Sequence, residues 1–135
     1  MRVFVAGATG AIGQRLIPQL VAAGHHVMAT TRTPAKVERL RALGAVPVVV
    51  DGLDAAAATR AVADAQPDAI VHQMTGLAGT PDLRRFDRWF AITNELRTMG
   101  TDILLAAARA LRRPNRRTRS RHSRLLPRLS SRPTA

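Results

Sequence analysis

The chain has 135 residues, which is enough for one domain with a buried core. It contains no cysteine, so disulfides and thiolate metal sites are excluded. Apolar residues make up 46% of the chain but aromatic residues only 3%, a mixture that suits helices packed on a buried sheet. No stretch approaches the ~20 apolar residues that span a membrane, and no signal peptide precedes the first apolar run. We therefore expect a cytoplasmic protein.

The formal net charge of +12 is unevenly distributed along the chain. The first 111 residues hold twelve Lys and Arg and all nine acidic residues, whereas residues 112–135 hold nine Arg and no acid. The hydrophobic periodicity also stops at Arg112, which predicts a disordered, Arg-rich tail over 112–135. Its charges can bind phosphates in a salt-sensitive way, but no aromatic residue is present to stack on bases. Only non-specific binding of nucleic acid is expected from this tail.

Turn signals divide residues 1–111 into alternating strand-like and helix-like segments. Residues 46–50 are a continuous apolar run, which predicts a strand buried on both faces of a parallel sheet. The alternation with short loops predicts an α/β fold, a Rossmann-like doubly wound parallel sheet truncated after about four strands. The expected strands are residues 2–6, 26–31, 46–50 and 69–73, and the expected helices are 11–23, 35–43, 55–65 and 83–111.

Several residues predict where these helices begin and end. Gly24 stands where a C-terminal cap is expected, and Asp54 where an N-cap is expected. Thr33 and Pro34 provide an N-cap and a first-turn proline for the second helix. Pro18 removes one backbone hydrogen bond within the first helix, so a bend is expected there.

A glycine loop joins the first strand to the first helix and reads Gly7-Ala8-Thr9-Gly10-Ala11-Ile12-Gly13. In a dinucleotide site the first glycine permits a tight turn, the second lets the backbone approach the pyrophosphate, and the third allows the helix to pack closely. Loop glycines also serve turns alone, but the order strand, loop, helix is the context that the motif requires. The predicted contacts with the dinucleotide are Gly7, Thr9, Gly10, Ala11, Ile12 and Gly13.

The end of the second strand predicts which dinucleotide is bound. An NAD site usually has an acidic residue about 20 positions after the loop, accepting hydrogen bonds from the ribose 2′-hydroxyl. Here the sequence is Thr30-Thr31-Arg32, with no carboxylate. Arg32 can pair with a 2′-phosphate, assisted by Thr31 and Lys36, which favours NADP over NAD. The alternative is a solvated arginine after a strand.

With glycines spaced Gly-x-x-Gly-x-x-Gly, the chain resembles the short-chain dehydrogenase/reductase superfamily, and within it the NAD-dependent epimerase/dehydratase family. The stretch Val50-Asp51-Gly52-Leu53 is similar to a family segment in which Asp51 would meet the adenine amino group and Leu53 would flank the ring. The alternative is a polar strand end beside a turn. By the same resemblance Gln73, Met74 and Thr75 lie along the nicotinamide ribose.

The resemblance extends to a later helix and then stops. Residues 100–109 match the family's Gly-Thr-x-x-Leu-Leu-x-Ala-Ala helix, and Asn94 precedes it at a longer spacing than usual. The family's reaction centre is a Tyr-x-x-x-Lys pair, yet this sequence has no Tyr and a single Lys, Lys36. His72, at a strand end, is interpreted as a hydrogen-bonded core residue. No catalytic residue and no metal ligand is therefore predicted.

These observations predict an NAD(P)-binding domain over residues 1–111, the N-terminal part of an epimerase- or reductase-like protein, inactive as it stands and of unknown substrate. A frameshift would explain the change of composition at Arg112. Without a fifth strand the fourth strand is a bare edge, which favours self-association. The alternative functions are a non-catalytic NADP sensor and nucleic-acid binding through the tail.

Overall fold

The computed structural model describes residues 1–77 and 80–112 of the chain. Within them, four parallel strands form one sheet in the order β3-β2-β1-β4. The strands are β1 (Arg2–Ala6), β2 (His26–Thr31), β3 (Val46–Val49) and β4 (Ala69–His72), and the α-helices are α1 (Ala11–Ala22), α2 (Val37–Ala42), α3 (Ala55–Ala65) and α4 (Phe86–Arg112). The predicted Rossmann-like fold is confirmed, while the predicted tail lies outside the described residues except for Arg112.

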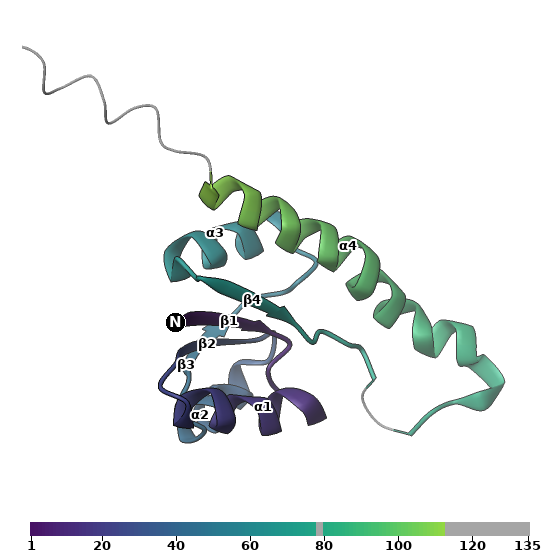
Figure 1. Cartoon of the computed structure of the whole chain (residues 1–135). Helices are drawn as coiled ribbons and strands as arrows, with labels where there is room; N and C mark the ends of the chain where they lie inside the picture. The colour runs from purple at the N-terminus through teal and green to yellow at the C-terminus, as the bar shows by residue number, and fades with distance from the viewer. Residues whose placement is uncertain (78–79, 113–135) are drawn as a thin grey trace, which may run out of the picture.

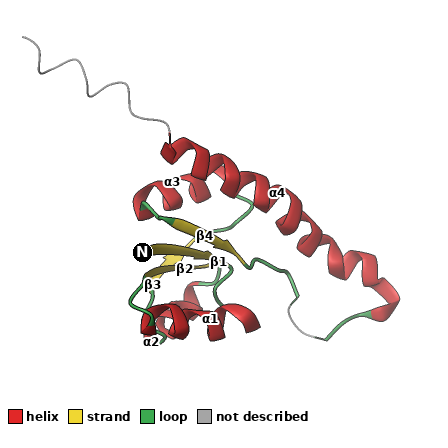
Figure 2. Cartoon of the chain, viewed as in Figure 1, coloured by secondary structure: helices red, strands yellow, loops and turns green. Residues whose placement is uncertain are grey.

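Helices cover both faces of the sheet, with α1 and α2 on one side and α3 and α4 on the other (Figures 1 and 2). The strand residues alternate between the two layers, as a pleated strand requires. Phe4 of β1 packs toward Val62 of α3 and Leu104 of α4, whereas Val5 belongs to the cluster that contains Ile17 of α1 and Leu40 of α2. Each helical layer therefore has its own apolar core, and β1 contributes to both.

The prediction that the third strand is buried on both faces is wrong. Val46 is 46% exposed and Val49 is 50% exposed. The reason is the place of β3 at the edge of the sheet, where it pairs with β2 alone. The apolar run is real, but it contains Pro47, which has no backbone N–H to donate and which is the sequence signal for an edge strand. The prediction that the fourth strand forms the other edge agrees with the sheet order.

The helix ends follow the predicted signals in most places. Asp54 caps α3, with its side chain accepting a hydrogen bond from the backbone N–H of Ala57 at 3.0 Å. Gly24 follows α1 with a φ of +82° and donates to the Val21 carbonyl. Helix α1 continues through Pro18. The predicted helix at 35–43 is instead a 3-10 turn, Pro34–Lys36, followed by the short helix α2.

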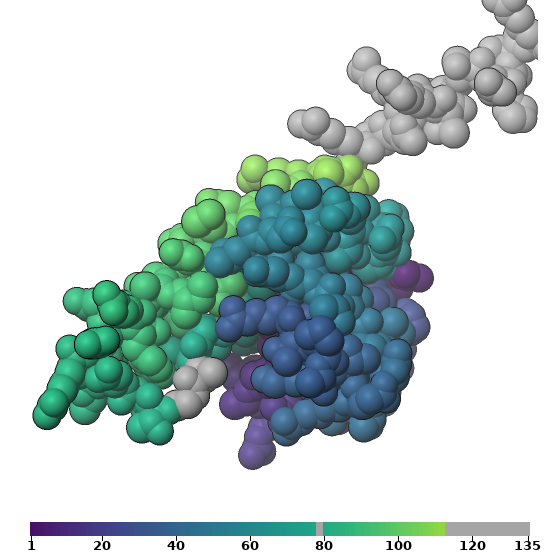
Figure 3. All heavy atoms as spheres, turned by 180° about the vertical axis from the view of Figure 1, so that it is seen from behind, coloured from purple at the N-terminus to yellow at the C-terminus, as the bar shows by residue number. Residues whose placement is uncertain are grey.

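The first turns of helix α4 extend beyond the sheet (Figure 1), and this end of the helix protrudes from the rest of the molecule (Figure 3). A 3-10 turn, Leu83–Arg85, leads into it. Three of the four aromatic side chains of the sequence cluster here: Phe86 is stacked on Phe90 with ring centroids 5.2 Å apart, and Trp89 is tilted against Phe90 with centroids 5.8 Å apart. Among residues 1–77 and 80–112, no helix combines the length and hydropathy of a membrane span.

Candidate cofactor-binding site

The glycine loop leaves the carboxyl end of β1 and turns sharply at Gly7. This residue has a φ of +82°, a conformation that side chains rarely adopt. A Cβ atom on Gly7 would also lie 2.5 Å from the backbone nitrogen of Met74, in the segment that follows β4. The turn therefore requires glycine for two reasons, its backbone conformation and the close approach of a neighbouring strand end.

Helix α1 begins at the loop with an open N-terminus. Gly10 is its N-cap and supplies no side-chain hydrogen bond, and no acidic residue lies in the first turn. The first backbone N–H groups of a helix have no partner within the helix, and the helix dipole places partial positive charge there. A Cβ atom on Gly10 would meet only the Gly7 carbonyl oxygen, at 3.7 Å. The loop therefore leaves space and hydrogen-bond donors for an anion such as a pyrophosphate.

Gly13 serves packing within the loop. A Cβ atom at this position would lie 2.3 Å from the carbonyl oxygen of Ala8. The sequence predicts close packing of the helix on the sheet, and the structure places the close contact at Ala8, the second residue after β1. Gly13 thus brings the first turn of α1 back against the loop that precedes it.

A groove of about 470 Å³ lies along the carboxyl ends of the strands. This edge is where open α/β sheets bind their ligands. Its walls come from the glycine loop, from the end of β2, from the turn after β3 and from the segment after β4. Ten predicted cofactor contacts line it: Gly7, Thr9, Gly10, Ala11, Thr31, Arg32, Asp51, Gln73, Met74 and Thr75.

Three predicted contacts do not line the groove. Ile12 has a side chain that is 62% exposed on the surface of α1, and Gly13 is buried against Ala8. Leu53 packs against the apolar core between the sheet and the helices α3 and α4. The contact of Leu53 with an adenine ring stays a prediction, and its backbone N–H donates to the Asp51 carboxylate at 2.9 Å.

The charged side chains of the groove are segregated. Arg32 and Lys36 are exposed at the end that follows β2, while Asp51 is the acidic residue of the lining and follows β3. Thr31 is buried, and its hydroxyl oxygen accepts a hydrogen bond from the Thr33 backbone N–H at 3.1 Å. The Thr31 hydroxyl therefore shapes the turn that carries Arg32.

A model of the NAD(P)H-binding family matches residues 7–113. The chain belongs to this family. It is 45% identical over 112 residues to the 3-diazoavenalumate denitrifying reductase of Streptomyces sp, a match covering 82% of this chain and 34% of that one. Membership of this family supports a nicotinamide dinucleotide as the class of cofactor.

Solved structures extend the similarity to epimerases. A putative epimerase from Burkholderia cenocepacia J2315 is 34% identical, with a TM-score of 0.56 over 78% of this chain and 32% of that chain. The Bordetella bronchiseptica enzyme WbmG, in complex with NAD and UDP, is 25% identical, with a TM-score of 0.63 over 82% of this chain and 34% of that chain. The expected resemblance to epimerases is confirmed, and the chain spans about a third of the length of these relatives.

Other residues of the groove were not predicted as contacts. Thr30 accepts a hydrogen bond from the Gly7 backbone N–H at 3.0 Å, which links the second strand to the glycine loop. Gly76 donates through its backbone to the Thr93 hydroxyl at 3.0 Å and so ties the segment after β4 to α4. Neither bond has a signal in the local sequence, because each joins segments that are distant along the chain. The unpredicted lining residues are Thr30, Thr33, Val50, Gly52, Gly76, Leu77 and Leu96.

His72 is hydrogen-bonded through both ring nitrogens. Nδ1 accepts from the Met74 backbone N–H at 3.2 Å, so Nε2 carries the proton and donates to the Leu96 carbonyl at 3.1 Å. This agrees with its interpretation as a core residue. Asn94 is exposed on α4 and does not line the groove. Residues 1–77 and 80–112 hold no group of three His, Asp or Glu side chains placed to bind a metal.

Proposed function

We propose that the chain binds NADP(H) in this groove, with the pyrophosphate on the glycine loop and the 2′-phosphate beside Arg32. The proposal rests on the position of Arg32 and Lys36, which lie on the wall of the groove that follows β2, where no carboxylate is present. A carboxylate there would accept hydrogen bonds from a ribose 2′-hydroxyl and repel a phosphate. A guanidinium presents donors that match phosphate geometry.

The Arg32 guanidinium is available for such a contact. It is exposed, and it forms no hydrogen bond or ion pair within the part of the chain that the structure describes. Thr31 and Thr33 fix the backbone on which it stands. The nearby Lys36 adds a second positive charge to the same wall. This wall therefore attracts an anion without first having to break an existing ion pair.

The remaining contacts follow the direction of the groove. Asp51 stands at the β3 end, where its carboxylate is oriented by the Leu53 N–H and can accept from an adenine amino group. Gln73, Met74 and Thr75 stand after β4, on the side proposed for the nicotinamide ribose. Ala11, Ile12 and Gly13 would contribute backbone N–H groups to the pyrophosphate.

The proposal is tested by titrating NADPH and NADH into the purified chain while following nicotinamide fluorescence. NADPH should bind about tenfold more tightly or better, since a hydrogen bond to a charged group contributes about 1.5–3 kcal/mol. Arg32→Ala should remove this preference. Arg41→Ala is the matched control, because Arg41 is paired with Glu38 on α2, outside the groove.

Equal affinities for the two dinucleotides would contradict the 2′-phosphate assignment and favour a solvated Arg32. If neither dinucleotide binds at high micromolar concentration, the proposed function is wrong as a whole.

We also propose that this chain holds the cofactor without completing hydride transfer. Hydride transfer needs an oriented cofactor together with a proton donor for the substrate. The sequence has no Tyr, and the ring nitrogens of His72 are both engaged with backbone groups. The measurement is NADPH oxidation with carbonyl substrates of several classes, where turnover by the purified chain would contradict the proposal.

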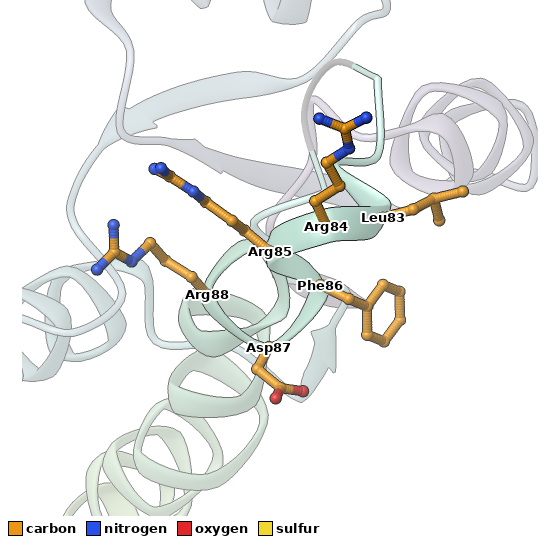
Figure 4. Close-up of a pocket in the computed structure, with 6 residues that line it drawn as sticks. All are labelled: Leu83, Arg84, Arg85, Phe86, Asp87 and Arg88. Carbon is orange, nitrogen blue, oxygen red and sulfur yellow. The ribbon is translucent and has the colours of Figure 1, made fainter.

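We infer in addition that the free edge of β4 lets the chain self-associate. Within residues 1–77 and 80–112, β4 pairs with β1 alone, and an unpaired edge is a template for another strand. Sedimentation velocity should show a species that grows with concentration. The competing surface is formed by the 3-10 turn Leu83–Arg85 and the start of α4, where Leu83 is 81% exposed and points with Phe86 away from Arg85 and Arg88 (Figure 4).

The two surfaces are separated by a double variant, Leu83→Ser with Phe86→Ser, and by Met99→Ser as a control on an exposed part of the same helix. Association through β4 should persist in both. Its loss in the double variant alone would assign the association to α4, and a constant sedimentation coefficient in the unaltered chain would contradict association altogether.

A further inference from the structure

The side chain of Gln14 connects the glycine loop to the neighbouring helix α2. Its Nε2 donates a hydrogen bond to the Thr9 carbonyl oxygen, with the two atoms 2.8 Å apart, and its Oε1 accepts one from the Arg39 guanidinium. Gln14 lies in the first turns of α1, and Arg39 lies in α2, which covers the same face of the sheet (Figure 1). A chain of two hydrogen bonds thus runs from α2 through α1 to the loop.

We propose that Gln14 and Arg39 are positioning residues for the dinucleotide cradle, which keep the Thr9–Gly10 peptide in the orientation that a pyrophosphate requires. The proposal rests on the function proposed above. A peptide between Thr9 and Gly10 has one face that donates and one that accepts, namely the Gly10 N–H and the Thr9 carbonyl. The Gln14 amide engages that carbonyl, so its oxygen is not free to turn toward the groove.

The orientation matters because Thr9 and Gly10 both line the groove. A carbonyl oxygen that turned toward a bound phosphate would place two negative ends together, whereas N–H groups stabilise the anion. Gly10 has no side chain to oppose rotation of this peptide, and its own N–H meets the Gly7 carbonyl only at 3.5 Å. The loop therefore depends on a contact from outside for a fixed carbonyl, and Gln14 supplies it.

Arg39 and the Thr9 carbonyl favour the same orientation of the Gln14 amide. An arginine side chain has donors and no acceptor, so it must meet the amide oxygen. The amide nitrogen then faces Thr9, whose carbonyl needs a donor. Without Arg39 the Thr9 carbonyl still selects the amide nitrogen, but the amide oxygen loses the partner that holds the Gln14 side chain against the loop.

Both residues act through the loop, because neither Gln14 nor Arg39 lines the groove. This predicts a loss of affinity that does not depend on the 2′-phosphate. A direct contact of Arg39 with the 2′-phosphate would instead weaken NADPH alone. The ratio of the NADPH and NADH affinities therefore distinguishes a positioning role of Arg39 from a direct contact with the 2′-phosphate. A merely structural role of either residue would change the unfolding temperature and leave both affinities unchanged.

The test uses four single variants of the whole chain. Gln14→Leu and Arg39→Ala remove the two bonds, while Gln19→Leu and Arg41→Ala are matched controls in the same helices; Gln19 donates to the Arg15 carbonyl, and Arg41 pairs with Glu38. Gln14→Leu and Arg39→Ala should each weaken NADPH and NADH about three- to tenfold, the equivalent of one neutral hydrogen bond. The double variant should be no weaker than Gln14→Leu, because the two residues act in series.

Three results would overturn the proposal: unchanged affinities in Gln14→Leu, a loss confined to NADPH in Arg39→Ala, or additive losses in the double variant. Arg39→Lys should recover part of the affinity, since a lysine also donates to the amide oxygen.

A second measurement keeps this inference separate from the proposed function. In the free protein, the backbone amide signal of Gly10 in a ¹H–¹⁵N spectrum should broaden or shift in Gln14→Leu and Arg39→Ala but not in the two controls. If the unaltered chain binds neither dinucleotide, the proposed function fails. The Gly10 signal still shows whether Gln14 and Arg39 hold the Thr9–Gly10 peptide in place. A Gly10 signal that is the same in all four variants overturns the inference.

Discussion

Thr30 holds Gly7 in place through a hydrogen bond of 3.0 Å between its hydroxyl oxygen and the Gly7 backbone N–H. The Thr30 carbonyl accepts a second bond, of 3.1 Å, from the next residue of the loop, Ala8. Because Thr30 is the fifth residue of β2 and only 4% exposed, the second strand fixes the start of the loop that follows the first. The glycine loop therefore depends on two adjacent strands, although its motif directly follows only one of them.

Thr30→Val should destabilise the fold, because the variant keeps the shape of the side chain but leaves the Gly7 N–H without its acceptor. An unsatisfied buried donor costs about 1–3 kcal/mol in the free energy of unfolding. Urea denaturation measures this loss. Thr30→Ser retains the hydroxyl and should lose distinctly less, and an equal loss in both variants would show that the bond to Gly7 is not what matters.

Two alanine substitutions in the glycine loop should have opposite consequences. Gly13→Ala places a Cβ 2.3 Å from the Ala8 carbonyl and should cost about 1–3 kcal/mol of stability or more, as overpacking does. Gly10→Ala meets only the Gly7 carbonyl oxygen at 3.7 Å, so the variant should fold normally, yet its methyl group would enter the space proposed for the pyrophosphate. Denaturation and NADPH titration of both variants measure the two effects.

The opposite pattern, a stable Gly13→Ala or an unaltered NADPH affinity in Gly10→Ala, would contradict the roles assigned to these glycines.

His72 should be present as the tautomer with its proton on Nε2. The Met74 N–H donates to Nδ1, which leaves Nε2 to donate to the Leu96 carbonyl. Long-range ¹H–¹⁵N correlation spectra of the neutral ring distinguish the tautomers directly. Replacement by Leu should lower the free energy of unfolding by about 1–3 kcal/mol, because the Met74 N–H loses its acceptor. A ring with its proton on Nδ1 would contradict the bond to Met74.

The parts of the fold that could be predicted from the sequence depend on local signals. The glycine loop could be recognised because a strand, three spaced glycines and a helix follow one another directly. The cap at Asp54 and the position of Gly24 are set by neighbouring residues. In each case the interacting atoms belong to residues that are close together in the sequence, so the local sequence pattern is enough to predict the feature.

The features that could not be predicted depend on distant segments. The exposure of Val46 and Val49 follows from the place of β3 at the sheet edge, which the valines themselves do not specify and which only Pro47 indicates. The packing of Leu53 against the apolar core depends on α3 and α4, which its local motif does not specify. The bond of Thr30 to Gly7 joins residues 23 positions apart. Such contacts become visible only when the strands are placed side by side.

Chemical-shift mapping with NADP⁺ can locate a dinucleotide on the glycine loop and its 2′-phosphate at Arg32 in a single titration. Backbone ¹H–¹⁵N signals of Gly10, Ala11 and Ile12 should move on titration, together with the side-chain Nε signal of Arg32. The Arg32 signal should stay in place when NAD⁺ is used instead. Shifts confined to the Arg-rich residues after Arg112 would mean that the phosphates bind there by charge alone, and would contradict the placement of the dinucleotide on the glycine loop and at Arg32.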